Sequence, residues 1–408
     1  MRPETFIASR LFSVSREQMS STIIRIAVLS VAVGLAVMMI SVAVVIGFKN
    51  QIRSKVTGFV SEIQIEALNN NLSSEALPMV LDDELFLKLV DNEEIKHFQA
   101  VAQKAGIVKT DDNIQGVILK GVGDDYDWTY LNDRIVAGRP ISFSDTALTS
   151  EILVSKKIAG KLNLQPGQAL RMWFVDAESL QTRGRKFEIS GLFETGLAEF
   201  DDRFIFGDIG HVQKLYNWQP DQFGAVEIYL KQSANSAAVA ESLYYSVPVD
   251  LNVSTAEEKY PQIFDWLELQ DMNVWIILLL MVLVSGITMI STLLIIILER
   301  TSMIGILKAM GAGNAFIRRI FLFNSYRILV KGMLFGNAIA LTFIGLQSYF
   351  GWLKLPEESY YLSEVPVELH LYHFLLLNFG LLIIWSLALL IPVTVINAIQ
   401  PSKAIRYA

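Results

Sequence analysis

The segment Ile297–Phe321, ILERTSMIGILKAMGAGNAFIRRIF, decides how this chain is organised. A long apolar run ends at Leu298, and charge appears at once with Glu299 and Arg300. A helix-like pattern and several cations follow before the next apolar run begins. A charged break of this kind predicts a short segment that joins two membrane-spanning helices at one membrane surface.

The rest of the composition fits a membrane protein with a sizeable soluble part. The chain has 408 residues, of which 52% are hydrophobic, and its mean hydropathy is +0.40. Its charged fraction of 18% lies below the usual value of about 25%. A net charge of −7 gives no support for nucleic-acid binding. The absence of cysteine excludes disulfides, thiolate metal sites and cysteine nucleophiles.

Four stretches lack Asp, Glu, Lys and Arg, namely 26–48, 272–298, 332–353 and 371–400. Each is long enough to cross a hydrocarbon core of about 30 Å as a helix. The first is too long for a signal-peptide apolar core of about 7–15 residues, so we expect a retained anchor. In the third, the pair Gly332 and Gly336 fits either close approach of another helix or ordinary glycine in a membrane helix.

Flanking cations predict the orientation of these spans. Four arginines precede the first span, six cations separate the second and third, and two follow the fourth, so both termini and the quoted segment are expected in the cytoplasm. Cations at 49, 53 and 55 conflict with this scheme, but they begin a large domain, and large domains cross largely regardless of charge. The predicted order is a cytoplasmic amphipathic segment (1–22), a span (23–48), an outer domain (49–271), a span (272–298), a cytoplasmic helix (299–317), a span (318–350), an outer loop (351–370), a span (371–397) and a cytoplasmic tail (398–408).

The outer domain mixes strand and helix patterns, which predicts an α/β or α+β fold. The expected strands are 62–67, 113–121, 151–154, 168–175, 186–193 and 225–230. The expected helices are 83–90, 155–162, 211–218 and 234–246. The polar stretch Val175–Lys186 between two strands predicts a hairpin whose tip is either an interaction element or a solvated loop. A helical pattern over 259–273 continues into the second span as a stalk.

The sequence offers little sign of catalysis. The phosphate-loop, zinc-protease and nucleophile-elbow motifs do not occur. The acidic cluster GDDYDW, 123–128, has the wrong spacing for a calcium loop. The pair His370 and His373 has helical spacing, but interfacial anchoring is the stronger interpretation. We therefore expect a chain that is not an enzyme and that binds no cofactor or metal of its own.

The quoted segment resembles the connection after the second span in permeases of the MacB/FtsX superfamily of ABC transporters. Four further stretches are similar to the lipoprotein-releasing permeases of LolC/LolE type, and they cover the chain in order: PETFIASRLF (3–12), GFKNQIRSKVTGFVSEIQI (47–65), LPEESYYLSEVPVEL (355–369) and QPSKAIRYA (400–408). This resemblance implies four transmembrane helices with a MacB-type α/β periplasmic domain between the first and second, in the inner membrane of a Gram-negative envelope.

The resemblance also implies a function and partners. A homo- or heterodimer of permeases would work with a LolD-like ATPase dimer, which carries the ATP and magnesium, within the membrane lipids. It would extract lipoproteins from the outer leaflet and pass them to a LolA-like periplasmic carrier. The implied coupling residues are Glu299, Arg300, Met303, Ile304, Leu307, Lys308, Met310 and Gly311. The implied lipoprotein-cavity residues are Val42, Ile46, Phe48, Phe264, Leu267 and Ile276. The carrier-binding candidates on the hairpin are Asp176, Leu180, Arg183 and Arg185.

The side of the coupling helix that carries Met303, Ile304 and Leu307 is expected to face either lipid or the ATPase. Two other functions remain open. A mechanotransmission permease of MacB or FtsX kind would drive a periplasmic partner and move no lipid. A membrane-anchored receptor is the third possibility, which the lack of a cytoplasmic signalling domain disfavours.

Overall fold

The computed structural model describes residues 18–68, 76–110, 113–144, 147–175, 181–231 and 234–398. The chain divides into two compact units. We call the first, Met1–Asn50, Trp266–Lys354 and Glu364–Ala408, the helical unit. The second, Gln51–Asp265 and Leu355–Ser363, is the sheet unit. Most of the predicted N-terminal segment and of the C-terminal tail lies outside the described residues.

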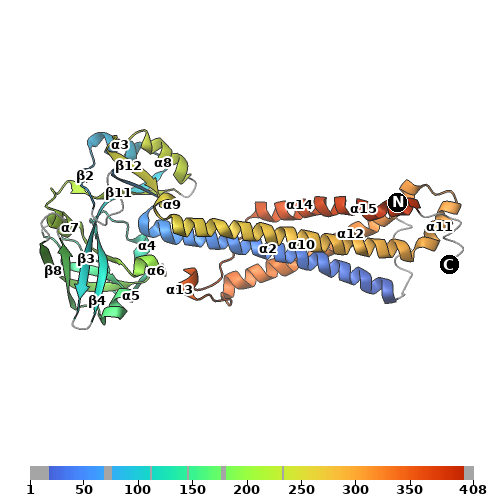
Figure 1. The fold of residues 1–408 in the computed structure, drawn as a ribbon, viewed down its shortest axis with the longest axis horizontal. Coiled ribbons are helices and arrows are strands. Elements are labelled where there is room, and N and C mark those ends of the chain that lie inside the picture. Colours follow the sequence, from blue (N-terminus) through green and yellow to red (C-terminus); the bar gives the residue numbers. More distant parts are fainter. Residues whose placement is uncertain are drawn as a thin grey trace. The chain divides into compact units, whose positions relative to one another are not determined.

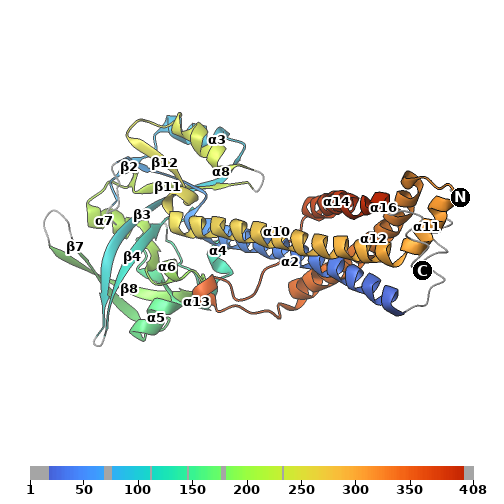
Figure 2. The same ribbon diagram turned by 45° about the vertical axis from the view of Figure 1, so that its right-hand side comes forward.

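The helical unit contains four long helices that run side by side (Figures 1 and 2). They are α2 (Gln18–Val60), α10 (Pro261–Glu299), α12 (Asn314–Phe350) and α14 (Leu371–Ala388). By length and composition, four segments can cross a membrane: Thr22–Val60, Pro261–Glu299, Asn314–Phe350 and Leu371–Asn397. The four predicted spans are thereby confirmed. The division between the units falls inside α2 and α10, so each of these helices contributes residues to both units.

The fourth span is interrupted near its end. The helix α14 stops at Ala388, four residues before Pro392, and two short helices follow, α15 (Leu390–Val393) and α16 (Val395–Ala398). Proline has no backbone N–H, and its ring clashes with the carbonyl group four residues earlier, which explains the position of this break.

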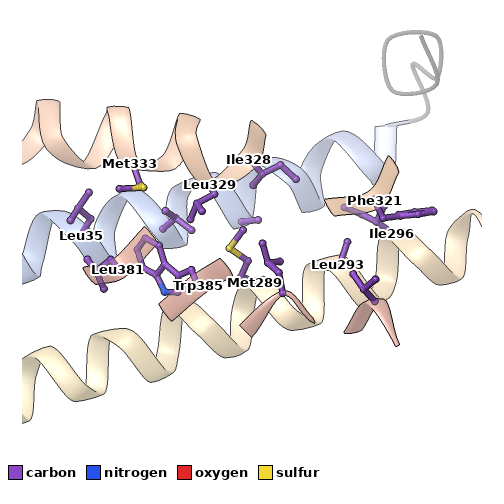
Figure 3. Close-up of a cluster of buried hydrophobic side chains, with 14 of the residues drawn as sticks. Leu35, Met289, Leu293, Ile296, Phe321, Ile328, Leu329, Met333, Leu381 and Trp385 are labelled. Atoms are coloured by element: carbon purple, nitrogen blue, oxygen red, sulfur yellow. The ribbon is translucent and has the colours of Figure 1, made fainter. Parts of the chain in front are cut away.

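Apolar side chains from all four long helices meet in the bundle core (Figure 3). Leu35 of α2 and Trp385 of α14 are fully buried there. The glycine pair of the third span permits close packing of α12 on α2. A Cβ atom at Gly332 would lie 2.6 Å from Cγ1 of Val31, and one at Gly336 would lie 2.7 Å from the carbonyl oxygen of Ala32. Close helix approach is therefore the correct interpretation of this pair.

The sheet unit is built on a ten-stranded mixed sheet in the order β12-β1-β11-β3-β4-β9-β6-β8-β5, with β7 paired to β3 and β8. Its strands are β1 (Ile63–Ala67), β3 (Ile95–Lys109), β4 (Ile114–Val122), β5 (Ile135–Gly138), β6 (Glu151–Ser155), β7 (Ala169–Val175), β8 (Thr182–Phe193), β9 (Phe204–Asp208), β11 (Ala225–Leu230) and β12 (Leu251–Thr255). The pairs β4–β9 and β6–β8 are parallel. A separate two-stranded sheet joins β2 (Met79–Val80) to β10 (Gln222–Phe223).

Helices cover this sheet in two groups. Near β12 lie α3 (Asp83–Asp91) and α8 (Ser236–Tyr244), which enclose one apolar core (Figures 1 and 2). A second core lies under α5 (Lys156–Leu162) and α7 (Ile209–Tyr216). Four short helices complete the described part of the sheet unit: α4 (Thr129–Asn132), α6 (Ala198–Asp201), α9 (Ala256–Lys259) and α13 (Glu357–Tyr360). The predicted α/β domain is confirmed, and its helices and sheet enclose two apolar cores.

Candidate functional site

The connection between the second and third spans contains its own helix. The helix α10 ends at Glu299, Arg300 occupies the N-cap position, and α11 runs over Thr301–Ala309. Gly311 then has a φ of +93°, a backbone conformation that side chains with a Cβ rarely adopt. The glycine at position 311 thus explains where this short helix ends.

One side of α11 packs inside the helical unit. Ile304 is fully buried in the bundle core, and Met303 and Leu307 pack against that core with partial burial. The ammonium group of Lys308 donates a hydrogen bond to the carbonyl oxygen of Ile396, at 2.7 Å. Ile304 therefore faces the chain's own core. The expectation that it faces lipid or the ATPase is wrong.

The opposite side of α11 is apolar and exposed. Ile306 is 49% exposed and Met310 is 72% exposed, and Ala309 beside them is exposed as well. Ile306 and Met310 are four residues apart, so their side chains are neighbours on the helix surface. We call Ile306, Ala309 and Met310 the outer face of α11. Of these residues, the sequence-based set included Met310 alone.

The candidates for the lipoprotein cavity have different surroundings. Phe48, Phe264 and Leu267 are buried within the chain, at 8%, 7% and 3% exposure. The ring of Phe48 packs edge-on against Trp266 at a centroid distance of 5.4 Å. These three side chains therefore pack against other residues of this chain.

The candidates Val42 and Ile46 are partly buried, whereas Ile276 is 50% exposed. Ile276 belongs to an apolar surface along α10 that we call the α10 stripe. Its members are Met272, Trp275, Ile276, Leu279, Leu280, Leu283, Val284 and Ile287, and each is at least half exposed. Of the six residues predicted to line the cavity, only Ile276 belongs to the α10 stripe, and the other members of the stripe were not predicted.

The predicted hairpin exists, because β7 and β8 pair in antiparallel fashion up to Val175 and Thr182. Its tip candidates Asp176 and Leu180 lie outside the described residues. The guanidinium group of Arg183 donates to the carbonyl oxygen of Leu215 at 3.3 Å and to Oδ1 of Asn217 at 3.2 Å. Arg183 thus anchors the hairpin on the end of α7. Arg185 donates to the carbonyl oxygen of Gly184, at 3.4 Å.

A buried polar network in the sheet unit was not foreseen from the sequence. Nζ of Lys120 lies 2.7 Å from Oε1 of Glu227, and the two side chains are 1% and 0% exposed. Lys120 also donates to the carbonyl oxygen of Phe59, at 3.0 Å. Gln64 and Gln99 each donate to the Glu227 carboxylate, at 3.3 Å and 3.0 Å. The charged pair is therefore buried with the hydrogen bonds that such burial requires.

Two tyrosines beside this network remain neutral. Burial raises the pKa of Tyr126 and of Tyr229 well above its ordinary value, and the nearby Glu227 carboxylate raises both further. The Lys120 ammonium lies 5.8 Å from the Tyr126 ring centroid and 5.3 Å from that of Phe59. The aromatic rings thus stabilise the buried ammonium group of Lys120.

Among the described residues, no group of three or more His, Cys, Asp or Glu side chains could hold a metal ion. Nε2 of His370 lies 3.0 Å from Oε1 of Glu368, and the His370 and His373 rings are 5.7 Å apart. The arrangement at the outer end of the fourth span is a polar surface cluster.

Comparisons with known proteins cover most of the chain. Residues 26–243 match the model of the MacB-like periplasmic core domain, and residues 275–401 match that of the FtsX-like permease C-terminal region. The lipoprotein-releasing system transmembrane protein LolE of Haemophilus influenzae is 20% identical over 94% of this chain and 94% of its own length. LolC proteins of the same system are 22% identical in Xylella fastidiosa strain 9a5c, over 93% of this chain and 92% of that protein, and 21% identical in Neisseria meningitidis, over 99% of each.

Proposed function

The chain belongs to the MacB/FtsX-like ABC permeases, in the branch that resembles LolC and LolE, and from this premise we propose that it extracts lipoproteins from the inner membrane. It is a non-catalytic, multi-pass inner-membrane protein with a MacB-type periplasmic domain. The proposed cargo leaves the outer leaflet and passes to a periplasmic carrier. Similarity along nearly the whole chain to proteins of lipoprotein-releasing systems is the observation that carries this proposal.

The energy for extraction comes from a separate subunit in this proposal. The sequence contains no phosphate-binding loop, and ABC permeases of this kind imply an ATPase partner. The outer face of α11 is the surface that we assign to the ATPase. Ile306 and Met310 supply exposed apolar area that a groove on a soluble partner can bury.

The cargo requires an apolar surface inside the membrane. Each buried methylene of an acyl chain contributes about 0.8 kcal/mol, so extraction of a multiply acylated protein needs both external energy and a receiving surface. We assign that surface to the α10 stripe, opposed by a second permease subunit. The exposed members of the stripe present aliphatic and aromatic groups with no charged side chain among them.

The β7–β8 hairpin is the proposed docking element for the carrier. Its two strands pair over the full lengths of β7 and the first half of β8, and Arg183 fixes it to the end of α7. Because its strands are already anchored, binding of a soluble partner to this hairpin would cost little conformational entropy in β7 and β8.

Mechanotransmission to a periplasmic partner, without movement of lipid, is the second candidate function. The observation that favours it is the length of α2 and α10, since each is a single helix that contributes to both units. The two candidates differ in whether an acyl chain contacts the α10 stripe.

Site-specific photo-crosslinking tests the proposal. A photoreactive residue at Ile276 or Leu279, in the complex with its ATPase, should capture lipoproteins, and ATP should reduce the captured amount. The matched control is the same substitution at Leu267, which is buried on the same helix. A complex that hydrolyses ATP yet never captures lipoprotein at Ile276 or Leu279 would overturn the assignment.

A further inference from the structure

Gln64 joins two helix ends in the sheet unit through its single amide group. It lies in β1, just after the end of α2 at Val60. Its Nε2 donates to the carbonyl oxygen of Val60 at 2.6 Å, and its Oε1 accepts a hydrogen bond from Nζ of Lys259, also at 2.6 Å. Lys259 ends α9, and α10 begins two residues later at Pro261. One side chain therefore bonds the last turn of α2 and the residue that leads into α10.

The local backbone makes this bridge specific. Ser61 has a φ of +67°, which ends α2 sharply and turns the chain into β1. The last carbonyl groups of a helix have no partner within the helix. Here the carbonyl oxygens of Phe59 and Val60 accept hydrogen bonds from Lys120 and Gln64.

The Gln64 side chain is itself buried, and it has a further hydrogen-bond partner in the same network. Gln64 is 5% exposed, and its Nε2 lies 3.3 Å from Oε1 of Glu227. Glu227 in turn is paired with Lys120. Removal of this amide takes away the side-chain partner of the Val60 carbonyl oxygen, whereas Lys259 keeps its ion pair with Oε2 of Glu66 at 2.9 Å.

We propose that Gln64 is a positioning residue that makes the ends of α2 and α10 in the sheet unit move together during the transport cycle. This assignment rests on the proposed function, because it needs an ATP-driven cycle that moves these helices. Gln64 contacts neither cargo nor nucleotide in this account. It acts through the two helix ends, in the manner of an element that has to keep two neighbouring segments in register.

The chain offers a matched control in Gln99. This glutamine is 1% exposed and donates to Oε2 of the same Glu227, at 3.0 Å. Its other hydrogen bonds go to the hydroxyl group of Tyr229 and from the backbone N–H of Asp127. These partners belong to none of α2, α9 and α10. Replacement of Gln99 therefore damages the same network without touching the bridge.

The first test measures how firmly the ends of α2 and α10 are held relative to each other, without any transport assay. The chain has no cysteine, so Gln51→Cys and Gln262→Cys place two spin labels at exposed sites of α2 and α10 within the sheet unit. The distance distribution between the labels should be narrow in the parent protein and with Gln99→Met, and broader with Gln64→Met. An equally narrow distribution with Gln64→Met would contradict the positioning role.

The second test reports on coupling in the reconstituted transporter. We expect Gln64→Met to lower the lipoprotein released per ATP hydrolysed by about tenfold, which corresponds to about 1.4 kcal/mol, the upper end of the net contribution of one ordinary hydrogen bond. Gln99→Met should lower the melting temperature to a similar extent and leave this ratio unchanged. Equal ratios in the two variants would overturn the inference. A parent complex that releases no lipoprotein would instead contradict the proposed function, and the spin-label result would still stand.

Discussion

Replacement of Ile306 by aspartate should weaken binding of the ATPase without destabilising the fold of the permease. Ile306 is 49% exposed on the outer face of α11, whereas Ile304, two residues earlier, is fully buried in the bundle core. A charge at position 306 therefore remains in solvent in the isolated permease. The same charge at position 304 would enter the core and destabilise the helices themselves.

The expected loss of affinity follows from exposure. Full burial of an isoleucine side chain contributes about 1.5–3 kcal/mol, so the exposed half of Ile306 contributes roughly 0.8–1.5 kcal/mol on docking. An aspartate there also leaves a polar group imperfectly paired in the interface, at a cost of about 1–3 kcal/mol. Together these amount to about 2–4 kcal/mol, or a roughly 30- to 1,000-fold weaker complex.

The assay is the dissociation constant between the permease in nanodiscs and its purified ATPase, measured beside the melting temperature of the permease. Ile306→Asp should weaken binding with little change in melting temperature. Asn314→Asp is the control, because it places the same charge at an exposed position at the start of α12, off the outer face. Unchanged affinity with Ile306→Asp would refute the assignment of the outer face to the ATPase.

Three further outcomes are expected. Gly332→Leu should lower the stability of the helical unit by about 1–3 kcal/mol through overpacking against α2, while Gly345→Leu, in open space on the same helix, should change the melting temperature little. Lys120→Met should cost about 3–5 kcal/mol because it leaves the Glu227 carboxylate buried and unpaired, and the double variant with Glu227→Met should regain much of this in a denaturation assay. Burial lowers the pKa of His211 below its ordinary value of about 6.5, so the unfolded chain binds this proton more readily. The contribution of His211 is therefore fully present above that value and is lost as the pH falls, and His211→Gln should show a smaller drop in melting temperature between about pH 7 and pH 5.

Much of the fold could be predicted from composition and pattern. The spans follow from uncharged runs, and strands such as β11 and β7 follow from β-branched or aromatic residues between turn signals. The strand β3 was missed because polar residues occupy buried positions in it. Gln99 and Lys104 are 1% and 3% exposed, so burial in this strand does not follow the polar and apolar alternation that identifies a strand.

The candidate site could be predicted only in part, since α11 is apolar on more than one side. Periodicity located the helix, but Ile304 and Ile306 look equivalent in the sequence, and only tertiary packing shows which of them is buried. The bridge at Gln64 is less visible still. Its partner Lys259 lies 195 residues away, and a glutamine with a lysine at that separation carries no sequence signal.

Release of lipoprotein from proteoliposomes shows whether this permease extracts lipoproteins from the membrane. The permease is reconstituted with the ATPase and any second permease that purify with it, together with an acylated lipoprotein and a soluble periplasmic carrier. We expect ATP to move lipoprotein from the vesicle to the carrier, and Ile306→Asp to prevent this transfer. ATP hydrolysis that is stimulated by the permease while all lipoprotein stays in the membrane would contradict the proposed function.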